Sequence, residues 1–448
     1  MTRTTCRWAA RAAAGWLAIA SGVALAQPTI TSRGSVSAMV DALPNVDATE
    51  LRVRLDEVID VEFDDQWVIK VGSWVDVLGA QRRGQGEADL VYQPGEIYVR
   101  HRRGHFDLTA GFQRIVWGTL DEIQPTDVIN PIDVSRFLME GRGEARLPVL
   151  ALRGRAFLPG DTTVDAVYVP AFRRGRYDLL DEPSSPFNLQ ADQCQADVCI
   201  ATTPGAPGTA VVLPLVSDPP ARTLEHGSGG VRVTRPFGGV DLGASVYRGW
   251  QAFPLVALTV VPTVMPAGGV GVSPALTSVA LRESWSRLTM VGGDLEAAQG
   301  SVTWRAEGAW LVDTGLQAEP GGRVVDGRSL QIGAGLDWTV GPWRLFGNAI
   351  ARRAWAVGPT AALVPSTGGL QLVGGAERKF ARDTRLVRGF AVVDPGEGTA
   401  FVRGLGAWNV RDNLWIEGSA AWFTGDGTDF LGRFTDRDFV SVRVKYYF

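Results

Sequence analysis

The last eleven residues of the chain, Asp438 to Phe448, alternate between two kinds of side chain. One face carries Val440, Val442, Val444, Tyr446 and Phe448, and the other carries Ser441, Arg443 and Lys445. Successive side chains of a β-strand point to opposite sides, so this pattern predicts a strand that separates an apolar environment from a wet one. An amphipathic edge strand of a soluble β-sandwich would show the same alternation, and the rest of the chain has to decide between the two.

The opposite end of the chain has the features of a secretory signal peptide over residues 1–26. Three arginines precede a small, apolar stretch that ends in Ala-Leu-Ala just before Gln27. A positive start, a short apolar stretch and an A-x-A site are typical of a leader that is cleaved during export. We therefore expect the mature protein to leave the cytoplasm and to consist of residues 27–448.

Residues 27–448 divide into strand-like runs of about the length that a tilted strand needs to cross a bilayer. Very short connections such as Gly238-Gly239 alternate with longer ones, as in barrels with short periplasmic turns and long external loops. The sequence predicts one all-β domain, a transmembrane antiparallel β-barrel of about 18 strands. The strands are expected at Gly34–Ala42, Leu51–Phe63, Trp67–Gly79, Asp89–Arg102, His105–Trp117, Leu147–Leu158, Thr163–Phe172, Gly229–Phe237, Val240–Trp250, Arg287–Ala298, Ser301–Asp313, Ser329–Val340, Trp343–Val357, Leu370–Ala381, Thr384–Asp394, Thr399–Val410, Leu414–Thr424 and Asp438–Phe448.

Three long connections, residues 119–146, 173–228 and 251–286, are the predicted loops. A wide barrel usually folds at least one loop inward, which narrows its lumen. The loop at 251–286 is unusually poor in charge for a wet surface. It could plug the lumen, pack on another loop, line a site for an apolar ligand or add a hairpin that brings the barrel to 20 strands; we favour plugging or packing.

Cys194 and Cys199 are the two cysteines that remain after removal of the leader, and both lie in the longest predicted loop. In an oxidising compartment they are expected to form a local disulfide. The ring that it closes is short, so it would fix the shape of the loop and add little to overall stability.

Many charged side chains fall on the strand faces that are expected to line the lumen. Opposed rows of arginine and carboxylate would produce a transverse field that orients polar solutes; alternatively the charges pair along the wall, which we favour. A small excess of basic residues predicts a preference for anions. The predicted lining residues include Arg52, Arg54, Lys70, Arg100, Arg153, Arg155, Arg232, Arg305, Glu307, Asp337, Arg443 and Lys445.

The most distinctive local sequence runs from Gly111 to Leu138 and places a Trp-Gly pair at a predicted strand end. Together with YVPAF at residues 168–172, it resembles uncharacterised proteobacterial outer-membrane β-barrels, porin-like proteins whose junction reads WG followed by D-x-x-N-P-x-D. The residues of this motif here are Trp117, Asp127, Asn130, Pro131 and Asp133. More distantly, the chain is similar in design to alginate-export channels, and the resemblance implies work beside an export system.

Taken by themselves, Asp127, Asn130 and Asp133 predict Asx turns that shape a loop. Calcium ligation by the same side chains is a minor alternative. The resemblance extends over part of the chain, whereas the remainder agrees with these barrels in architecture alone, so it says little about the substrate.

The sequence gives little support to an enzyme. After the leader there is no G-x-S-x-G, H-E-x-x-H or phosphate-binding glycine loop, and only three histidines are present. No cofactor and no metal is implied. The net charge of −4 argues against nucleic-acid binding, which needs a concentrated basic face.

We therefore predict a porin-like channel of the outer membrane that passes small-molecule solutes through a polar lumen narrowed by a loop. One alternative is a conduit for apolar or amphipathic compounds, linked to an export or catabolic system and lined by residues 251–286. Another is a structural or adhesive barrel with a closed lumen. The expected partners are outer-membrane lipid, solutes and periplasmic export components, and the architecture is compatible with a homo-oligomer.

Overall fold

The computed structural model describes residues 28–448 apart from 83–84, 122, 135–144, 177–197, 202–209, 214, 263–276, 320–322, 359–361, 364–367, 426–428 and 430. The predicted signal peptide and Cys194 lie outside the described residues. Cys199 lies on a short strand, β8 (Val198–Ala201), of which only the backbone is described. The disulfide between the two cysteines therefore stays a prediction.

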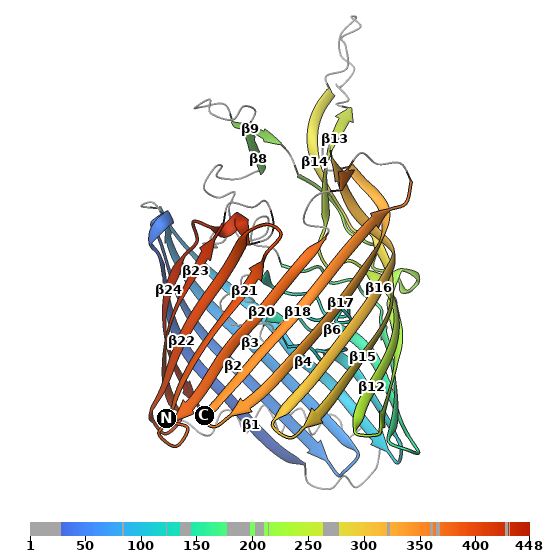
Figure 1. Cartoon of the computed structure of the whole chain (residues 1–448), viewed down its shortest axis with the longest axis vertical. Helices are drawn as coiled ribbons and strands as arrows, with labels where there is room; N and C mark the ends of the chain where they lie inside the picture. Colours follow the sequence, from blue (N-terminus) through green and yellow to red (C-terminus); the bar gives the residue numbers. More distant parts are fainter. Residues whose placement is uncertain are drawn as a thin grey trace, which may run out of the picture.

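Eighteen antiparallel strands form one closed barrel (Figure 1). Each pairs with the next barrel strand along the chain, and β1 also pairs with β24, from Ser35 opposite Tyr447 to Ala42 opposite Val440. This last pairing closes the cylinder, so that no strand edge is left open. The strands are β1 (Thr29–Leu43), β2 (Ala48–Phe63), β3 (Trp67–Arg82), β4 (Gln85–Arg103), β5 (Phe106–Gln113), β6 (Val149–Leu158), β7 (Thr162–Val169), β11 (Ser228–Phe237), β12 (Val240–Trp250), β15 (Arg287–Gln299), β16 (Val302–Glu319), β17 (Arg323–Val340), β18 (Trp343–Ala356), β20 (Gly369–Phe380), β21 (Arg385–Asp394), β22 (Thr399–Arg411), β23 (Leu414–Thr424) and β24 (Phe439–Tyr447).

These strands correspond one to one with the predicted ones, and the barrel prediction is confirmed. At the end of the barrel where β1 begins and β24 ends, every connection is a tight turn. Each such turn contains a residue with a positive φ, for example Asp64, Gly300 or Asn413. A left-handed residue is what a tight hairpin needs to reverse its direction without splaying the strands.

The expected alternation of short and long connections is only partly correct. At the opposite end, several connections are as short as the tight turns, among them residues 44–47, 83–84 and 395–398. Between β3 and β4 the reason is that the flanking strands are long, with 16 and 19 residues. Where a strand pair itself continues past the membrane, little chain is left over to form a loop.

The low-charge loop does form a hairpin, but not in the barrel wall. Its strands β13 (Leu255–Pro262) and β14 (Thr277–Ser284) pair with each other, and β14 also pairs with β10 (Leu215–Asp218) from the preceding loop. This three-stranded sheet stands beyond the barrel rim (Figure 1). The described part of the loop thus packs on another loop, and the barrel keeps eighteen strands rather than 20.

The outer wall is apolar, with outward tryptophans near the tight turns. On β24, the side chains of Val440, Val442 and Val444 are exposed, whereas Ser441 is buried on the inner side. Trp67, Trp338, Trp343 and Trp408 point outward near the tight turns, where a membrane interface would hold them. Among the described residues, no helix is long and apolar enough to cross a bilayer.

Candidate functional site

The strand register places the predicted lining residues on the inner face of the wall. On β2, Arg52 and Arg54 are each 8% exposed, while their neighbours Leu51 and Val53 lie on the exposed outer face. Residues that stand opposite each other share a face, which extends this inner face round the barrel. It includes Lys70, Arg100, Arg153, Arg155, Arg232, Arg305, Glu307, Asp337, Arg443 and Lys445.

Most of these charges are paired along the wall. Arg54 donates two hydrogen bonds to Asp76, with distances of 2.5 and 2.8 Å. Arg100 and Lys445 make no ion pair with any described residue. The remaining pairs are Arg52–Glu50, Lys70–Glu96, Arg153–Asp165, Arg155–Asp107, Arg232–Asp294, Arg305–Asp337 and Arg443–Glu417.

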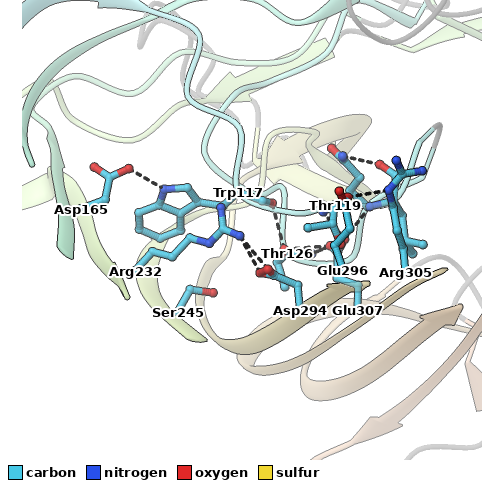
Figure 2. Close-up of polar contacts among 12 residues, drawn as sticks. Trp117, Thr119, Thr126, Asp165, Arg232, Ser245, Asp294, Glu296, Arg305 and Glu307 are labelled. Atoms are coloured by element: carbon cyan, nitrogen blue, oxygen red, sulfur yellow. Dashed lines mark hydrogen bonds and ion pairs between the residues drawn. The ribbon is translucent and has the colours of Figure 1, made fainter. Parts of the chain in front are cut away.

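The connection between β5 and β6 runs inside the barrel and contacts several wall strands (Figure 2). We call its described residues, 114–121, 123–134 and 145–148, the inner segment. Its main anchor is the carboxylate of Glu307 on β16, which is 3% exposed. Glu307 accepts hydrogen bonds from the backbone N–H groups of Thr119 (3.0 Å), Leu120 (3.3 Å) and Thr126 (2.6 Å).

Two further features fit the inner segment to this carboxylate. The Thr126 hydroxyl lies 2.7 Å from Oε1 of Glu307. Gly118 has a φ of +134°, and a Cβ on it would lie 2.8 Å from the same oxygen. Only glycine fits this position, because any other residue would be strained at that φ and its Cβ would collide with the carboxylate. The glycine of the Trp-Gly pair therefore allows the close approach.

Asn130 ties the beginning of the inner segment to its end. Its side-chain oxygen accepts a hydrogen bond from the N–H of Ile115 at 2.7 Å, and its amide nitrogen donates to the carbonyls of Gln113 (3.1 Å) and Leu147 (2.8 Å). The carbonyl of Pro131 accepts from the N–H of Leu147 at 2.8 Å. The expected Asx turn does not form at Asn130, because all of its bonds go to residues at least fifteen positions away.

The two acidic residues of the motif, Asp127 and Asp133, bind arginines. Asp127 accepts a hydrogen bond from Nε of Arg146 at 2.8 Å. Asp133 forms an ion pair with Arg176 at 3.4 Å. The backbone of Arg176 is also hydrogen-bonded to that of Ile132 and Val134. Nearby, Arg173 donates to the carbonyl of Pro148. Burial, together with the charges of Arg176 and Arg114, lowers the pKa of Arg173 to about 10, so it stays protonated at neutral pH.

Trp117 was expected at the end of a strand, and this expectation is wrong. Strand β5 ends at Gln113 because the N–H of Ile115 is bound by Asn130 and not by a neighbouring strand. Trp117 is fully buried inside the barrel, with its ring edge-on to Tyr247 at 6.2 Å between centroids. Its Nε1 donates to Asp165 at 3.4 Å (Figure 2).

The inner segment also adds a charge to the wall. The carboxylate of Asp121 lies 3.6 Å from Arg305 and 3.9 Å from Arg344. Arg305 is bound in addition by Glu296 at 2.7 Å and by Asp337. A cluster of two arginines and three carboxylates therefore stands where the segment meets β15, β16, β17 and β18.

On another side, the segment meets an apolar surface that the sequence did not predict. Leu120 and Ile123 pack in a cluster formed by inward side chains of β18, β20–β24, β1 and β2, by the turn between β1 and β2, and by the connection that precedes β24. Its aromatic members are Phe390, Phe401, Phe423, Phe434 and Phe439. Phe401 and Phe423 occupy positions that alternate with lipid-facing residues such as Val402 and Trp422. That alternation was the available signal, but we expected inner positions to be polar.

Among the residues that the structure describes, no group of three or more His, Cys, Asp or Glu side chains is close enough to hold a metal ion.

No family model and no curated protein matches the chain. Over 94% of its length it is similar to the solved structures of OccK7 (OpdD) and OccK5 (OpdH) of Pseudomonas aeruginosa, covering 99% and 97% of those chains at TM-scores of 0.48 and 0.46 and identities of 10% and 8%. A mutant of the Rh. blastica porin is similar at a TM-score of 0.36, with 12% identity and 94% of this chain and 100% of that chain covered. Likenesses this low carry no argument about the function of the chain.

Proposed function

We propose that this protein is a channel of the bacterial outer membrane that passes small polar solutes through its lumen, with the inner segment as its constriction. The observation that carries the proposal is the contact of Glu307 with Thr119, Leu120 and Thr126, which fixes a stretch of backbone inside the barrel. The apolar outer wall and the tight turns at one end support a place in the outer membrane, with the long loops outside.

The width of the barrel and the polarity of its inner face support the passage of solutes. Closed barrels of 16 to 18 strands are wide enough to leave an aqueous channel. Charges that are paired along the wall and partly exposed, such as Arg443 with Glu417, keep that channel hydrated without a strong net field. Asp121, Arg305 and Arg344 form a charged cluster at the proposed constriction, and we assign them the largest influence on which ions pass.

A second candidate, a conduit for amphipathic compounds, is favoured by the apolar cluster around Leu120. There, the aromatic side chains of β21–β24 face the inner segment and not the lipid. Among the described residues, the apolar surface around Leu120 is thus formed by the wall, with no contribution from the described part of 251–286. If this path is used, Phe401→Asp lowers the uptake of an amphipathic dye into liposomes and leaves the ion conductance unchanged.

The channel proposal is tested by labelling one residue of the inner segment in a planar bilayer. In a background with Cys194→Ser and Cys199→Ser, Asp121→Cys provides a thiol at a side chain that is 29% exposed. We expect steady, ohmic single-channel steps that shrink severalfold when a bulky thiol reagent is added. The reason is that the label would lie in the proposed constriction.

Asp218→Cys in the same background is the matched control, because Asp218 lies on β10, outside the barrel, and is 61% exposed. Its labelling should leave the conductance unchanged. Ohmic steps that labelling at residue 121 does not affect would show that the inner segment is not the constriction. No conductance in either protein would favour a closed, structural barrel.

A further inference from the structure

Four arginines face the lipid at the barrel end opposite the tight turns. They are Arg248 on β12, Arg287 on β15, Arg328 on β17 and Arg353 on β18. Each of them is preceded or followed by a residue that faces the lumen, so the arginine itself faces outward. These strands, with β16 between β15 and β17, are consecutive in the wall. On β20–β24 and β1–β7, no described arginine or lysine faces outward in the half of each strand that is farther from the tight turns. The basic face is therefore restricted to one sector.

Tryptophans mark the level of these arginines as an interface. The guanidinium of Arg287 lies 4.5 Å from the ring centre of Trp250, and that of Arg353 lies 5.5 Å from that of Trp355. Trp310 of β16 and Trp355 have ring centres 5.7 Å apart. Outward tryptophans gather at the level of lipid headgroups, so the four arginines lie at the headgroup level too.

Carboxylates do little to neutralise this face. Within the described part of the chain, Arg248 has one such partner, Asp313 at 3.3 Å, and both side chains are more than half exposed. Among the residues that the structure describes, Arg287 donates only to the backbone carbonyls of Gly227 (3.2 Å) and Glu225 (3.3 Å). Arg328 and Arg353 form no hydrogen bond or ion pair with any described residue. The sector is left with a net positive charge that faces the membrane.

The register groups the arginines in two pairs. Arg248 stands two positions from Trp250, the residue opposite Arg287, and Arg328 stands in the same relation to Arg353. The members of such a diagonal pair have Cα atoms about 7 Å apart, close enough for both to reach one phosphate. The pairs are separated by β16 alone, which places them roughly 10 Å apart across the wall.

We propose that this basic face, Arg248, Arg287, Arg328 and Arg353, binds the phosphate groups of a lipid in the outer leaflet of the membrane. Arginine suits this ligand because its planar fork donates two hydrogen bonds to one phosphate. A dissolved anion passing through the lumen would not meet these side chains, since they lie on the outer wall. The inference does not depend on which solute the channel carries.

The experiment compares defined lipids on the purified, full-length mature protein by native mass spectrometry. The probes are a glucosamine-disaccharide lipid with two phosphates and the same lipid without phosphate. We expect the phosphorylated lipid to stay bound after the detergent is removed and the other to dissociate. In Arg328→Gln/Arg353→Gln, the loss of one phosphate contact should weaken binding about tenfold. Arg248→Gln/Arg287→Gln should have a similar effect.

The matched control is Arg378→Gln/Arg385→Gln near the tight turns. These arginines also face outward over tryptophans, with Arg378 at 5.6 Å from Trp343 and Arg385 at 5.7 Å from Trp408. The control should keep its affinity for the phosphorylated lipid. Equal losses in the control and in the Arg328/Arg353 variant would overturn the proposal, because any interfacial arginine would then suffice. Equal binding of the two lipids, or displacement by millimolar inorganic phosphate, would overturn it as well.

Discussion

The inner segment and the hairpin β13–β14 are both long excursions of the chain between barrel strands, yet they end up on opposite sides of the rim. The inner segment enters the lumen, where Glu307 and Asn130 bind its backbone. The hairpin stands outside and uses its backbone to pair with β10. The hairpin is nevertheless the segment with fewer charges, so low polarity did not decide which one was buried.

The difference shows what a loop needs in order to stay inside a barrel. Backbone N–H and C=O groups that leave water must find partners. In the inner segment, those of Ile115, Thr119, Leu120, Thr126 and Leu147 are bound by polar side chains or by the segment itself. The hairpin satisfies its groups by strand pairing and needs no such acceptor from the wall.

The largest effect on conductance and stability is expected from Glu307→Ala. Three N–H groups of the inner segment would lose their acceptor, and each buried donor left without one costs about 1–3 kcal/mol. We expect the segment to detach from the wall. The single-channel conductance should then rise and become noisy, and the melting temperature should fall.

The control for this variant is Glu296→Ala on the neighbouring strand β15. Glu296 also faces the lumen, but it binds Arg305 and not the backbone of the inner segment. Its removal should leave the conductance steady. If Glu307→Ala gave the same quiet trace as the wild type, the segment would be held by other contacts.

The next largest effect, a loss of stability of the inner segment, is expected from Asn130→Ala. The change removes one acceptor and two donors from a site that is 4% exposed, which should cost about 2–3 kcal/mol. Asn130→Asp keeps the acceptor for Ile115 but places a charge beside two carbonyl oxygens, so we expect it to be no better than alanine. Hydrogen exchange of residues 113–131 measures the loosening directly. Unchanged protection in both variants would contradict the bridging role.

How far the sequence determines this arrangement depends on the kind of contact. Alternation predicted all eighteen strands and the inner position of residues such as Arg52 and Arg443, because a strand between lipid and water must alternate. It did not predict that the motif of Asp127, Asn130 and Asp133 would lie within the lumen. Their partners are Arg146, Ile115, Leu147 and Arg176, and only the three-dimensional fold brings them together.

A smaller effect, on ion preference, is expected from Arg443→Gln. Arg443 donates to Glu417 at 2.7 Å, and both side chains are only about one-fifth exposed, at 20% and 22%. Removing the arginine leaves a carboxylate without its partner on the lumen wall. The reversal potential in a salt gradient should therefore shift toward cation preference. Arg378→Gln, on the outer wall, should leave the reversal potential where it is.

The smallest effect is expected in the hairpin, from Arg282→Gln. Arg282 pairs with Asp218 at 2.8 Å, but the two side chains are 52% and 61% exposed, so water and salt screen the pair. Such pairs contribute at most about 1 kcal/mol. The backbone pairing of β14 with β10 does not depend on it. Conductance and melting temperature should both stay at the wild-type value; a change as large as that of Asn130→Ala would mean that the hairpin supports the channel and that the two excursions are not independent.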